Sequence, residues 1–308
     1  MARVDAVIVS YNSRETLLAG VAPLLEIPGV TVTVVDNASD DASLDVLRGL
    51  PVRALQAGRN GGFSVGCNLG TAAGDAPYVL YLNPDARIER ADLERLVAVL
   101  EAEPDVGIVG PRLLDGDGAL IANLRTRQRA STIWAQACFV HRLLPRARWG
   151  RELDYSPQAH DEVGYPEWVS GACMLARRSA LEQIGGFDEG FFLYSEDMDI
   201  CARMSARDWR VRYEPGATVR HQEGRSAPRT SLFPVLAQSR VRYARKHFGR
   251  VSAALQHAGV AVQELTHILA NLARPAHALG HATALRAVLR HGRVPAAPAP
   301  AELHRDAA

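Results

Sequence analysis

Lysine is nearly absent from this sequence of 308 residues: Lys246 is the only one, and the other 34 basic residues are arginines. The Gly-Lys-Ser/Thr triplet of a phosphate-binding P-loop does not occur, which excludes that class of nucleotide site. Apolar runs of about 18 residues are also missing, and Asp5 interrupts the N-terminal segment. We therefore expect neither a membrane-spanning helix nor a signal peptide.

Cysteine is scarce as well, and the cysteines form no Cys-x-x-Cys pair. This spacing predicts neither a zinc site nor a disulfide framework, and it favours small buried residues in a reducing compartment. We expect a cytoplasmic protein, or one that is peripheral on the inner face of the cytoplasmic membrane. The cysteines are Cys67, Cys138, Cys173 and Cys201.

The formal net charge is only +1, which argues against a nucleic-acid partner. This balance conceals an asymmetry, because residues 1–217 carry 22 basic and 30 acidic side chains whereas residues 218–308 carry 13 and 4. We therefore expect the basic C-terminal region to face an anionic membrane surface.

The first hundred residues alternate short apolar segments with segments of helical length, which predicts an α/β fold with a parallel, doubly wound sheet. Ligands of such sheets bind beyond the carboxyl ends of the strands. Strands are expected at residues 4–9, 31–35, 52–55 and 78–82. Helices are expected at residues 13–25, 42–50, 63–73, 91–102, 239–248, 251–272 and 278–291.

An acidic turn follows the second predicted strand. Asp36 lies at the end of that strand, where a carboxylate can accept a hydrogen bond from a ribose hydroxyl or a base N–H. In the alternative interpretation Asp36 or Ser39 only caps the next helix, and Ser39 or Asp40 is the expected cap.

A glycine-rich loop at residues 60–70 precedes and opens a predicted helix, where free N–H groups suit a diphosphate. Its segment 62–66 also matches the Gly-x-Ser-x-Gly nucleophile elbow of serine hydrolases, and Asp197 and His221 follow in the required order. An elbow needs a strand running directly into Ser64, but the preceding residues are polar and glycine-rich. The diphosphate interpretation is therefore preferred.

Asn83 and Asp85 end the fourth predicted strand and favour a site for Mg²⁺ or Mn²⁺ that a diphosphate also holds. The alternative is a plain turn, which Asn-Pro and Asp favour as well. Further along, Glu196, Asp197 and Asp199 follow an aromatic-rich run, which predicts carboxylates with perturbed pKa values, as a general base requires. His221 ends a later predicted strand and is a candidate metal ligand.

Together these motifs resemble the family 2 glycosyltransferases of the GT-A fold, a Rossmann-like α/β fold with a mostly parallel central sheet and flanking helices. The resemblance covers residues 4–249 and rests on five motifs in the family's order. It implies a nucleotide-sugar site formed by Ser10, Tyr11, Asn12, Asp36, Asn37, Asn60, Gly61, Gly62, Asn68, Asn83 and Asp85. It also implies catalytic residues Glu196 and Asp197, metal ligands Asp85 and His221, and an acceptor site at Trp168, Ser170, Gly171 and Ala172.

Residues 168–175 and 185–188 look most like the rhamnosyltransferase branch, whose members use dTDP-rhamnose and include enzymes acting on polyprenyl-diphospho-GlcNAc. The resemblance implies an inverting transfer, with Asp197 as base, to a lipid-linked or polysaccharide acceptor in cell-envelope glycan synthesis. The alternatives are a galactofuranosyl- or N-acetylhexosaminyltransferase that uses a UDP-sugar, the serine hydrolase, and a catalytically silent module that binds nucleotide sugars or membranes. Asn83 departs from the family, because many members have aspartate there and an amide is a poorer ligand for a hard cation.

The resemblance also implies a domain organisation. Residues 1–111 form the nucleotide-sugar half and residues 112–249 the acceptor and catalytic half of one GT-A domain. Residues 250–292 lie beyond the part of the chain that the resemblance covers, and their own apolar pattern predicts amphipathic helices that bind the membrane or pack a homodimer. The Pro/Ala-rich residues 293–308 are expected to be disordered.

A cluster of arginines and two tryptophans lies between the two halves and suits a lipid diphosphate at a membrane surface. Because nearly every basic residue of the chain is arginine, a solvated loop is the alternative. The cluster comprises Arg125, Arg127, Arg129, Arg142, Arg146, Arg148, Arg151, Trp134 and Trp149.

Overall fold

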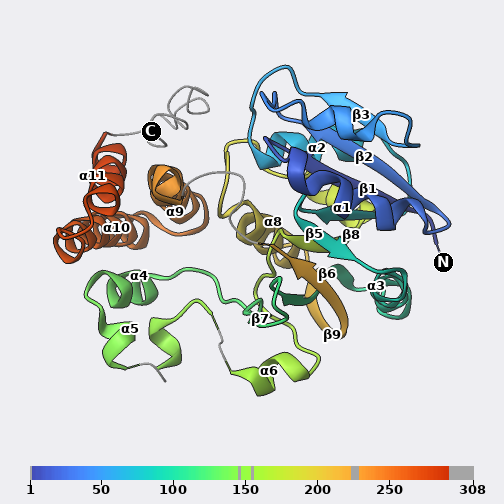
Figure 1. Ribbon diagram of the computed structural model, residues 1–308. Helices are drawn as coiled ribbons and strands as arrows, with labels where there is room; N and C mark the ends of the chain where they lie inside the picture. The colour runs from blue at the N-terminus through green and yellow to red at the C-terminus, as the bar shows by residue number, and fades with distance from the viewer. Residues whose placement is uncertain (1, 145–146, 154–155, 223–228, 291–308) are drawn as a thin grey trace. The chain divides into compact units, whose positions relative to one another are not determined.

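A computed structural model describes the chain except residues 1, 145–146, 154–155, 223–228 and 291–308 (Figure 1). The predicted tail at residues 293–308 and Arg146 of the arginine cluster lie outside the described residues. The chain divides into two compact units. The first comprises Met1–Arg125, Leu153–Glu189 and Glu196–Ser226, and the second comprises Thr126–Glu152, Gly190–Ser195 and Ala227–Ala308.

The first unit is built on a nine-stranded, mostly parallel sheet with the order β3-β2-β1-β4-β8-β6-β9-β5, and β7 pairs with β6. Three strands run against their neighbours: β8 is antiparallel to both β4 and β6, β5 is antiparallel to β9, and β7 is antiparallel to β6. The strands are β1 (Val4–Ser10), β2 (Val30–Asp36), β3 (Arg53–Gln56), β4 (Tyr78–Leu82), β5 (Ala86–Ile88), β6 (Val106–Leu114), β7 (Leu120–Ile121), β8 (Cys173–Arg177) and β9 (Arg210–His221).

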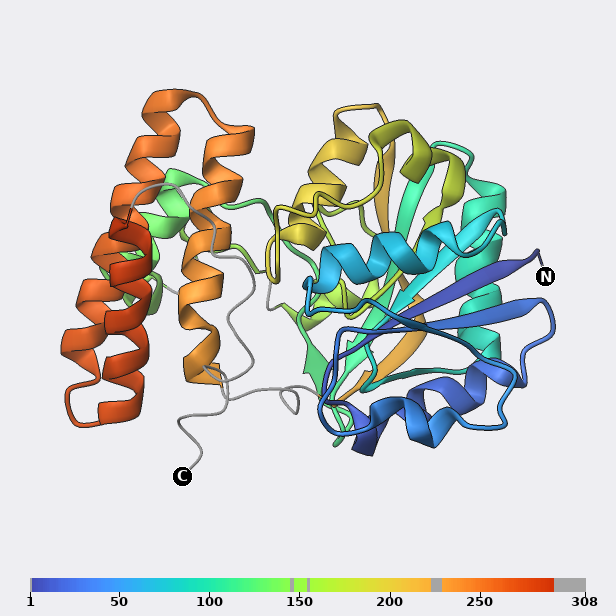
Figure 2. The ribbon, with the colours of Figure 1, turned by 90° about the horizontal axis from the view of Figure 1, so that it is seen from above.

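Helices cover both faces of this sheet (Figure 2). Val4, Ala6 and Ile8 of β1 share one apolar core with residues of α1 and α3, while the alternate residue Val7 faces α2. This alternation is the two-residue period of a strand buried on both faces. The helices and 3₁₀ turn of this unit are α1 (Arg14–Leu25), η1 (Ser43–Leu47), α2 (Phe63–Ala72), α3 (Arg90–Ala102), α6 (Pro157–Asp161), α7 (Arg178–Ile184) and α8 (Glu196–Ser205).

Gly70 allows α2 to lie close to β1. A Cβ atom at this position would come within 2.3 Å of Cγ1 of Val7, so any larger side chain would separate helix and strand. Gly62, which precedes the first residue of α2, has a φ of +86°, a conformation that glycine adopts without strain. The glycines of the loop therefore fix how α2 approaches the sheet.

The four strands predicted in the first hundred residues are confirmed, but the helix predicted at residues 42–50 is wrong. Only the 3₁₀ turn η1 forms there, because Ala42 has a left-handed φ of +55° and Gly49 one of +81°. The predicted cap is wrong as well. The carboxylate of Asp41, and not that of Asp40, accepts hydrogen bonds from the N–H groups of Ser43 and Arg14.

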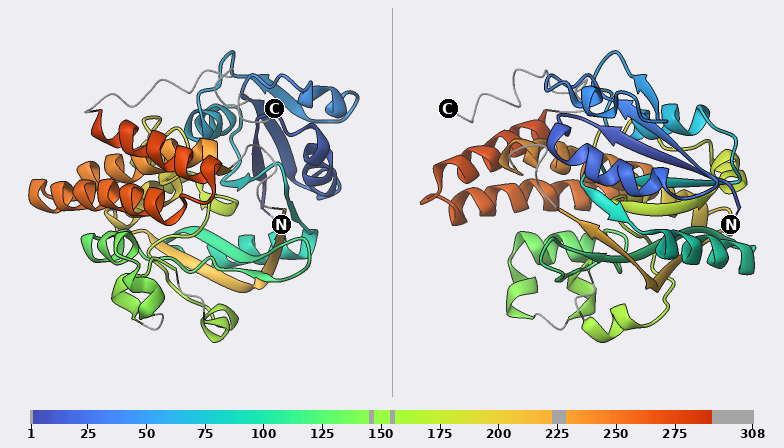
Figure 3. Two further views of the ribbon diagram at one scale, coloured as in Figure 1. Left: turned by 60° about the vertical axis from the view of Figure 1, so that its left-hand side comes forward. Right: turned by 45° about the vertical axis from the view of Figure 1, so that its right-hand side comes forward.

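The second unit is helical, and α10 packs against α4, α9 and α11 (Figure 3). The helices predicted at residues 239–248, 251–272 and 278–291 are confirmed. The first of them begins earlier than predicted, at Phe233. Pro234 lies in its first turn, where a backbone N–H would have no partner within the helix, so the missing N–H of proline costs no hydrogen bond. The elements are α4 (Ala130–Ala137), α5 (Val140–Leu143), η2 (Arg148–Gly150), η3 (Arg229–Leu232), α9 (Phe233–His247), α10 (Arg250–Ala270) and α11 (Pro275–Leu289). Among the described residues no helix is long and apolar enough to cross a membrane.

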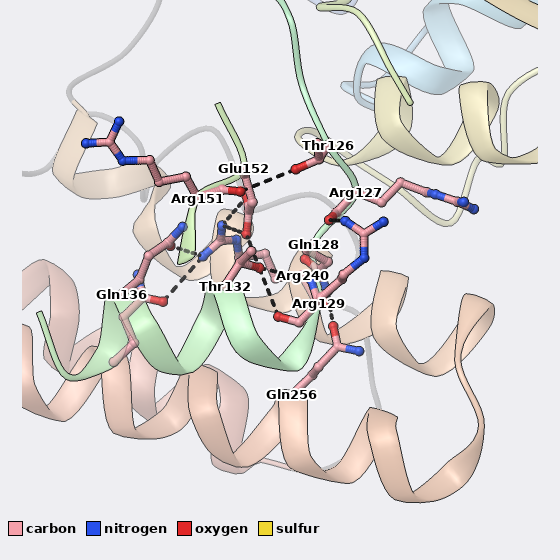
Figure 4. Close-up of polar contacts among 11 residues, drawn as sticks. Thr126, Arg127, Gln128, Arg129, Thr132, Gln136, Arg151, Glu152, Arg240 and Gln256 are labelled. Atoms are coloured by element: carbon pink, nitrogen blue, oxygen red, sulfur yellow. Dashed lines mark hydrogen bonds and ion pairs between the residues drawn. The ribbon is translucent and has the colours of Figure 1, made fainter. Parts of the chain in front are cut away.

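A buried ion pair holds the helical unit together (Figure 4). Nη2 of Arg240 lies 2.8 and 2.6 Å from the two carboxylate oxygens of Glu152, and Nη1 donates to the side-chain amide oxygens of Gln136 and Gln263. Both ion-pair side chains are largely buried. The guanidinium thus connects α9 with α4, α10 and the segment before residue 153.

We expect Arg240→Met to lower the free energy of unfolding of this unit by about 3–5 kcal/mol, because Glu152 would be left buried without its partner. Urea denaturation followed by circular dichroism measures the change. The double variant Arg240→Met/Glu152→Met removes both charges and should recover most of the loss. Equal losses in the single and double variants would contradict an electrostatic origin.

Candidate active site

The carboxyl ends of β1 and β2 lie side by side, because Ser10 pairs with Asp36 in the parallel ladder. The chain stays paired one residue further, where the N–H of Asn37 donates to the carbonyl oxygen of Ser10 at 2.8 Å. The side-chain amide of Asn37 then donates to the carbonyl oxygen of Gly62, 3.0 Å away, at the start of α2. The two strand ends and the glycine loop therefore meet at one edge of the sheet.

Three buried polar atoms at this edge have no hydrogen-bond partner among the described residues: Oγ of Ser10, Oδ1 of Asn37 and Oγ of Ser64. Buried polar groups without partners are rare and each destabilises the fold. Their concentration at the ends of β1 and β2 and in the first turn of α2 favours a polar ligand here.

The loops after β1 and β2 also bind each other. Oδ1 of Asn12 accepts from the N–H of Asp40, and Oγ of Ser39 accepts from the N–H of Asn12. Asp36 accepts from the N–H and hydroxyl of Ser39 at 3.1 and 2.5 Å, so it organises this turn. Burial raises the pKa of the neighbouring Tyr11, and its interaction with the Asn60 side chain opposes that shift.

Two other residues predicted to bind the nucleotide sugar, Asn60 and Asn68, form hydrogen bonds within the protein. Oδ1 of Asn60 accepts from the N–H of Gly62, and so shapes the glycine loop that begins at Gly61. The side chain of Asn68 exchanges two hydrogen bonds with the backbone of Phe187, at 3.0 and 2.9 Å. Asn68 could bind a nucleotide sugar only by giving up these hydrogen bonds to Phe187.

The predicted metal ligands Asp85 and His221 lie together. Strand β5 begins at Ala86, whose partner in β9 is His221, so this antiparallel register brings the imidazole beside the turn after β4. Nε2 of His221 is 3.1 Å from Oδ1 of Asp85 and 3.2 Å from the side-chain amide nitrogen of Asn83. Residues distant in sequence thus converge on one point.

The donor set fits a divalent cation that a ligand also holds. Among the described residues no group of three His, Cys, Asp or Glu side chains forms a complete metal site. Asp85 and His221 supply one carboxylate and one imidazole, with the amide of Asn83 adjacent, so further ligands would come from diphosphate oxygens and water, the usual arrangement for Mg²⁺ at phosphates.

The predicted catalytic pair begins α8. Glu196 is buried, and its Oε2 has no hydrogen-bond partner among the described residues, whereas Asp197 is partly exposed. Asp197 accepts from the N–H of Gly171 at 3.1 Å and from that of Met198 at 2.8 Å. The third carboxylate of the cluster, Asp199, is fully buried in an ion pair with Arg203, so its role is structural.

Burial raises the pKa of both carboxyl groups of the pair. The pKa of Glu196 lies well above its usual range, first through desolvation and then through the charge of Asp197. Desolvation also raises the pKa of Asp197, while the positive charge of Arg125 and the N–H of Gly171 lower it. Asp197 is partly exposed and lies beside groups that favour its ionised form, so it is better placed than Glu196 for the predicted role of general base.

The predicted acceptor segment contacts both Asp197, the predicted base, and Asn83, in the turn of the predicted metal ligand Asp85. The N–H of Gly171 donates to Asp197, and the carbonyl oxygen of Ala172 accepts from the N–H of Asn83 at 2.9 Å. The N–H of Ser170 donates to Oδ1 of Asn123. The antiparallel pairing of β8 with β4 creates this proximity, because Ala172 precedes the first residue of β8.

Trp168 does not present an open face for a sugar. It is only 7% exposed, and the guanidinium of Arg125 lies 4.7 Å from the centre of its ring. This position favours a packing role over stacking on an acceptor. Arg125 itself was assigned by sequence only to a lipid-binding cluster, and the charge it places near Asp197 had no sequence signal.

We expect Arg125→Met to move the acidic limb of the kcat/KM profile to higher pH. The base must be ionised, activity therefore rises through its pKa, and loss of the positive charge raises that pKa further. Rate measurements across pH check this shift. Arg125→Lys retains the charge and should restore the profile; an unshifted limb in Arg125→Met would exclude the electrostatic role.

The serine hydrolase alternative fails on geometry. Strand β3 ends at Gln56, several residues before Ser64, which lies inside the first turn of α2. His221 pairs with Asp85. The strand-to-serine turn of a nucleophile elbow is therefore missing.

Known proteins share both this sequence and this fold. Residues 5–185 match the family Glycosyl transferase family 2. The chain is 33% identical over 249 residues to N-acetylglucosaminyl-diphospho-decaprenol L-rhamnosyltransferase of Mycobacterium tuberculosis (strain CDC 1551 / Oshkosh), a match that covers 74% of this chain and 78% of the relative. It is 27% identical over 188 residues to rhamnosyltransferase WbbL of Escherichia coli (strain K12), which covers 58% and 68%.

Two solved structures share the fold. GalNAc-T7 with UDP, GalNAc and Mn²⁺ superposes with a TM-score of 0.59 at 16% identity and covers 80% of this chain and 48% of that one. Mannosyltransferase PcManGT from Pyrobaculum calidifontis with GDP-Man and Mn²⁺ superposes with a TM-score of 0.54 at 19% identity and covers 96% and 77%. The expected GT-A fold is confirmed. The matched family and the mycobacterial relative together show that this chain belongs to glycosyl transferase family 2, as a glycosyltransferase.

Proposed function

We propose that the protein transfers L-rhamnose from dTDP-rhamnose, with inversion, to a hydroxyl of a lipid-linked acceptor in envelope glycan synthesis. The observation that carries this proposal is the contact of Gly171 with Asp197, one residue before the contact of Ala172 with Asn83. It joins the base to the turn that would hold the diphosphate. The relatives named as rhamnosyltransferases support the choice of sugar, and the mycobacterial one supports the lipid-linked acceptor.

In the proposed mechanism the acceptor oxygen attacks the anomeric carbon while Asp197 takes its proton. The bond from that carbon to the diphosphate oxygen breaks, and the bonding electrons leave with the diphosphate. One displacement inverts the anomeric centre, so a β-linked donor gives an α-glycoside. The N–H groups at the start of α2 stabilise the departing anion.

A bound Mg²⁺ or Mn²⁺, held by Asp85 and His221, would supply positive charge to the leaving diphosphate. The two structural neighbours that contain Mn²⁺ support a divalent cofactor. The reaction would take place in the cytoplasm at the inner face of the membrane, where a lipid-linked acceptor is within reach.

Thermal shifts with dTDP-rhamnose, UDP-galactofuranose and UDP-N-acetylglucosamine, with and without Mn²⁺, test the donor. A ligand that binds only the folded protein raises its apparent stability, and we expect the largest increase with dTDP-rhamnose. A larger increase with either UDP-sugar would replace the proposed donor with the corresponding alternative. The anomeric configuration of the product, read by NMR, tests inversion separately.

A further inference from the structure

The charge asymmetry of the sequence corresponds to a whole structural unit. Its three segments, Thr126–Glu152, Gly190–Ser195 and Ala227–Ala308, contain 17 basic and four acidic residues, a formal net charge of +13. The other unit carries 18 basic and 30 acidic residues, a net charge of −12. The basic excess is therefore larger than the C-terminal sequence alone indicates, because the segment before residue 153 belongs with it.

The described acidic side chains of the helical unit do not reduce this charge at its surface. They are Glu152, which is largely buried in its pair with Arg240 (Figure 4), and Glu264, which is buried 2.7 Å from Nδ1 of His281. The exposed charged side chains that flank α10, Arg250 and Arg274, are both positive. The surface of this unit is thus cationic.

Helix α10 reverses the usual pattern of a surface helix, since polar side chains are among its buried residues and large apolar side chains are exposed. Its buried positions include the polar Gln256 and Glu264, and Gln256 accepts from the side-chain amide of Gln128 within the unit. Large apolar side chains occupy its exposed positions instead, extending to one residue just past its end. Val251 is 76% exposed, Leu255 50%, Leu265 48%, Leu269 60% and Leu272 68%.

The first four of these residues form one stripe along the helix. Their spacings of four, ten and four residues keep them on a single face, and the intermediate Ala258 and Val262 continue it, while Leu272 lies in the turn that follows. A contiguous apolar stripe on a cationic unit is the arrangement of a helix that lies in the interface of an anionic bilayer.

The same spacing is that of a coiled-coil seam, so a second copy of the chain is the competing occupant. The net charge of the helical unit favours the bilayer over a second copy. Pairing through α10 would bring two units of net charge +13 together, whereas an anionic surface would attract each one.

The geometry points to the exposed apolar face of α10, flanked by Arg250 and Arg274, as the surface that binds anionic phospholipid. In this proposal the exposed leucines insert into the acyl region of the bilayer, and the guanidinium groups of Arg250 and Arg274 bind the phospholipid headgroups. This inference deepens the proposed function, since it names where the enzyme meets the membrane of its lipid-linked acceptor, but it stands on the charges and exposure of the helical unit.

Vesicle sedimentation of the full chain tests the surface. Wild-type protein should bind vesicles of phosphatidylglycerol and phosphatidylethanolamine, bind phosphatidylcholine vesicles at least about tenfold more weakly, and lose binding as salt rises. Leu265→Gln/Leu269→Gln should lower the partition coefficient at least about tenfold. The matched control is Leu18→Gln on α1, 43% exposed in the other unit, which should bind as wild type does.

Circular dichroism first confirms that each variant is folded, and transfer to a water-soluble acceptor should be the same in Leu265→Gln/Leu269→Gln as in wild type. That readout separates a failure of this surface from a failure of the proposed reaction. Absence of wild-type binding, equal binding to neutral vesicles, or unchanged binding of the double variant would overturn the inference. A wild-type dimer that the double variant converts to monomer, without vesicle binding, would assign the face to a second copy.

Discussion

Replacing Asp197 with asparagine is expected to lower kcat about 10²–10⁴-fold, the range that general base catalysis supplies. The amide retains the size of the side chain and can still accept from the N–H of Gly171, so folding should be unaffected. It cannot take the acceptor proton. Steady-state rates of sugar transfer, with circular dichroism to confirm folding, measure the loss.

Glu196→Gln provides the matched comparison, because the neighbouring carboxyl is buried and its pKa is raised well above the usual range. Since burial favours the neutral form of this carboxyl group, an isosteric amide should cost much less activity than Asp197→Asn does. Near-normal turnover of Asp197→Asn, or a larger loss in Glu196→Gln, would move the role of base away from Asp197.

The second large effect is expected at the predicted metal ligands, Asp85 and His221. Asp85→Asn and His221→Gln should each lower kcat about 10²-fold or more, because a divalent cation contributes several kcal/mol to stabilising a leaving group and each 1.36 kcal/mol is tenfold. Binding of Mn²⁺ measured by electron paramagnetic resonance, with the nucleoside diphosphate present, should weaken in both variants independently of turnover.

Asn83→Asp tests the same site in the opposite direction. A carboxylate beside Nε2 of His221 is a better ligand for a hard cation than the native amide, 3.2 Å from that nitrogen, and Mn²⁺ should bind more tightly. Wild-type Mn²⁺ affinity in Asp85→Asn and His221→Gln would show that these residues pair only with each other.

Local patterns were sufficient where the relevant partners are close in sequence. The apolar runs that become β1, β2 and β4 and the glycine loop before α2 were predicted from residue order alone. The helix predicted at residues 42–50 was wrong, because apolar spacing does not show that Ala42 adopts a left-handed conformation.

The sequence also predicts which types of residue form the candidate active site. Asp85, Asp197 and His221 follow strand or helix boundaries where functional side chains concentrate, and the resemblance assigned their roles. Their contacts were not readable, since nothing local indicates that β8 runs antiparallel between β4 and β6. That same arrangement places the charge of Arg125 near Asp197 and its guanidinium over the ring of Trp168.

The amino-acid sequence by itself determined the α/β class, the family and the residue types of the site, because these depend on periodicity and on motifs of adjacent residues. Only the tertiary structure decided which distant residues meet. Strand register placed His221 beside Asp85, and packing turned the leucines of α10 outward while Gln256 and Glu264 found buried partners. A helical pattern shows that one face is apolar; the partners available in the fold decide which face is buried.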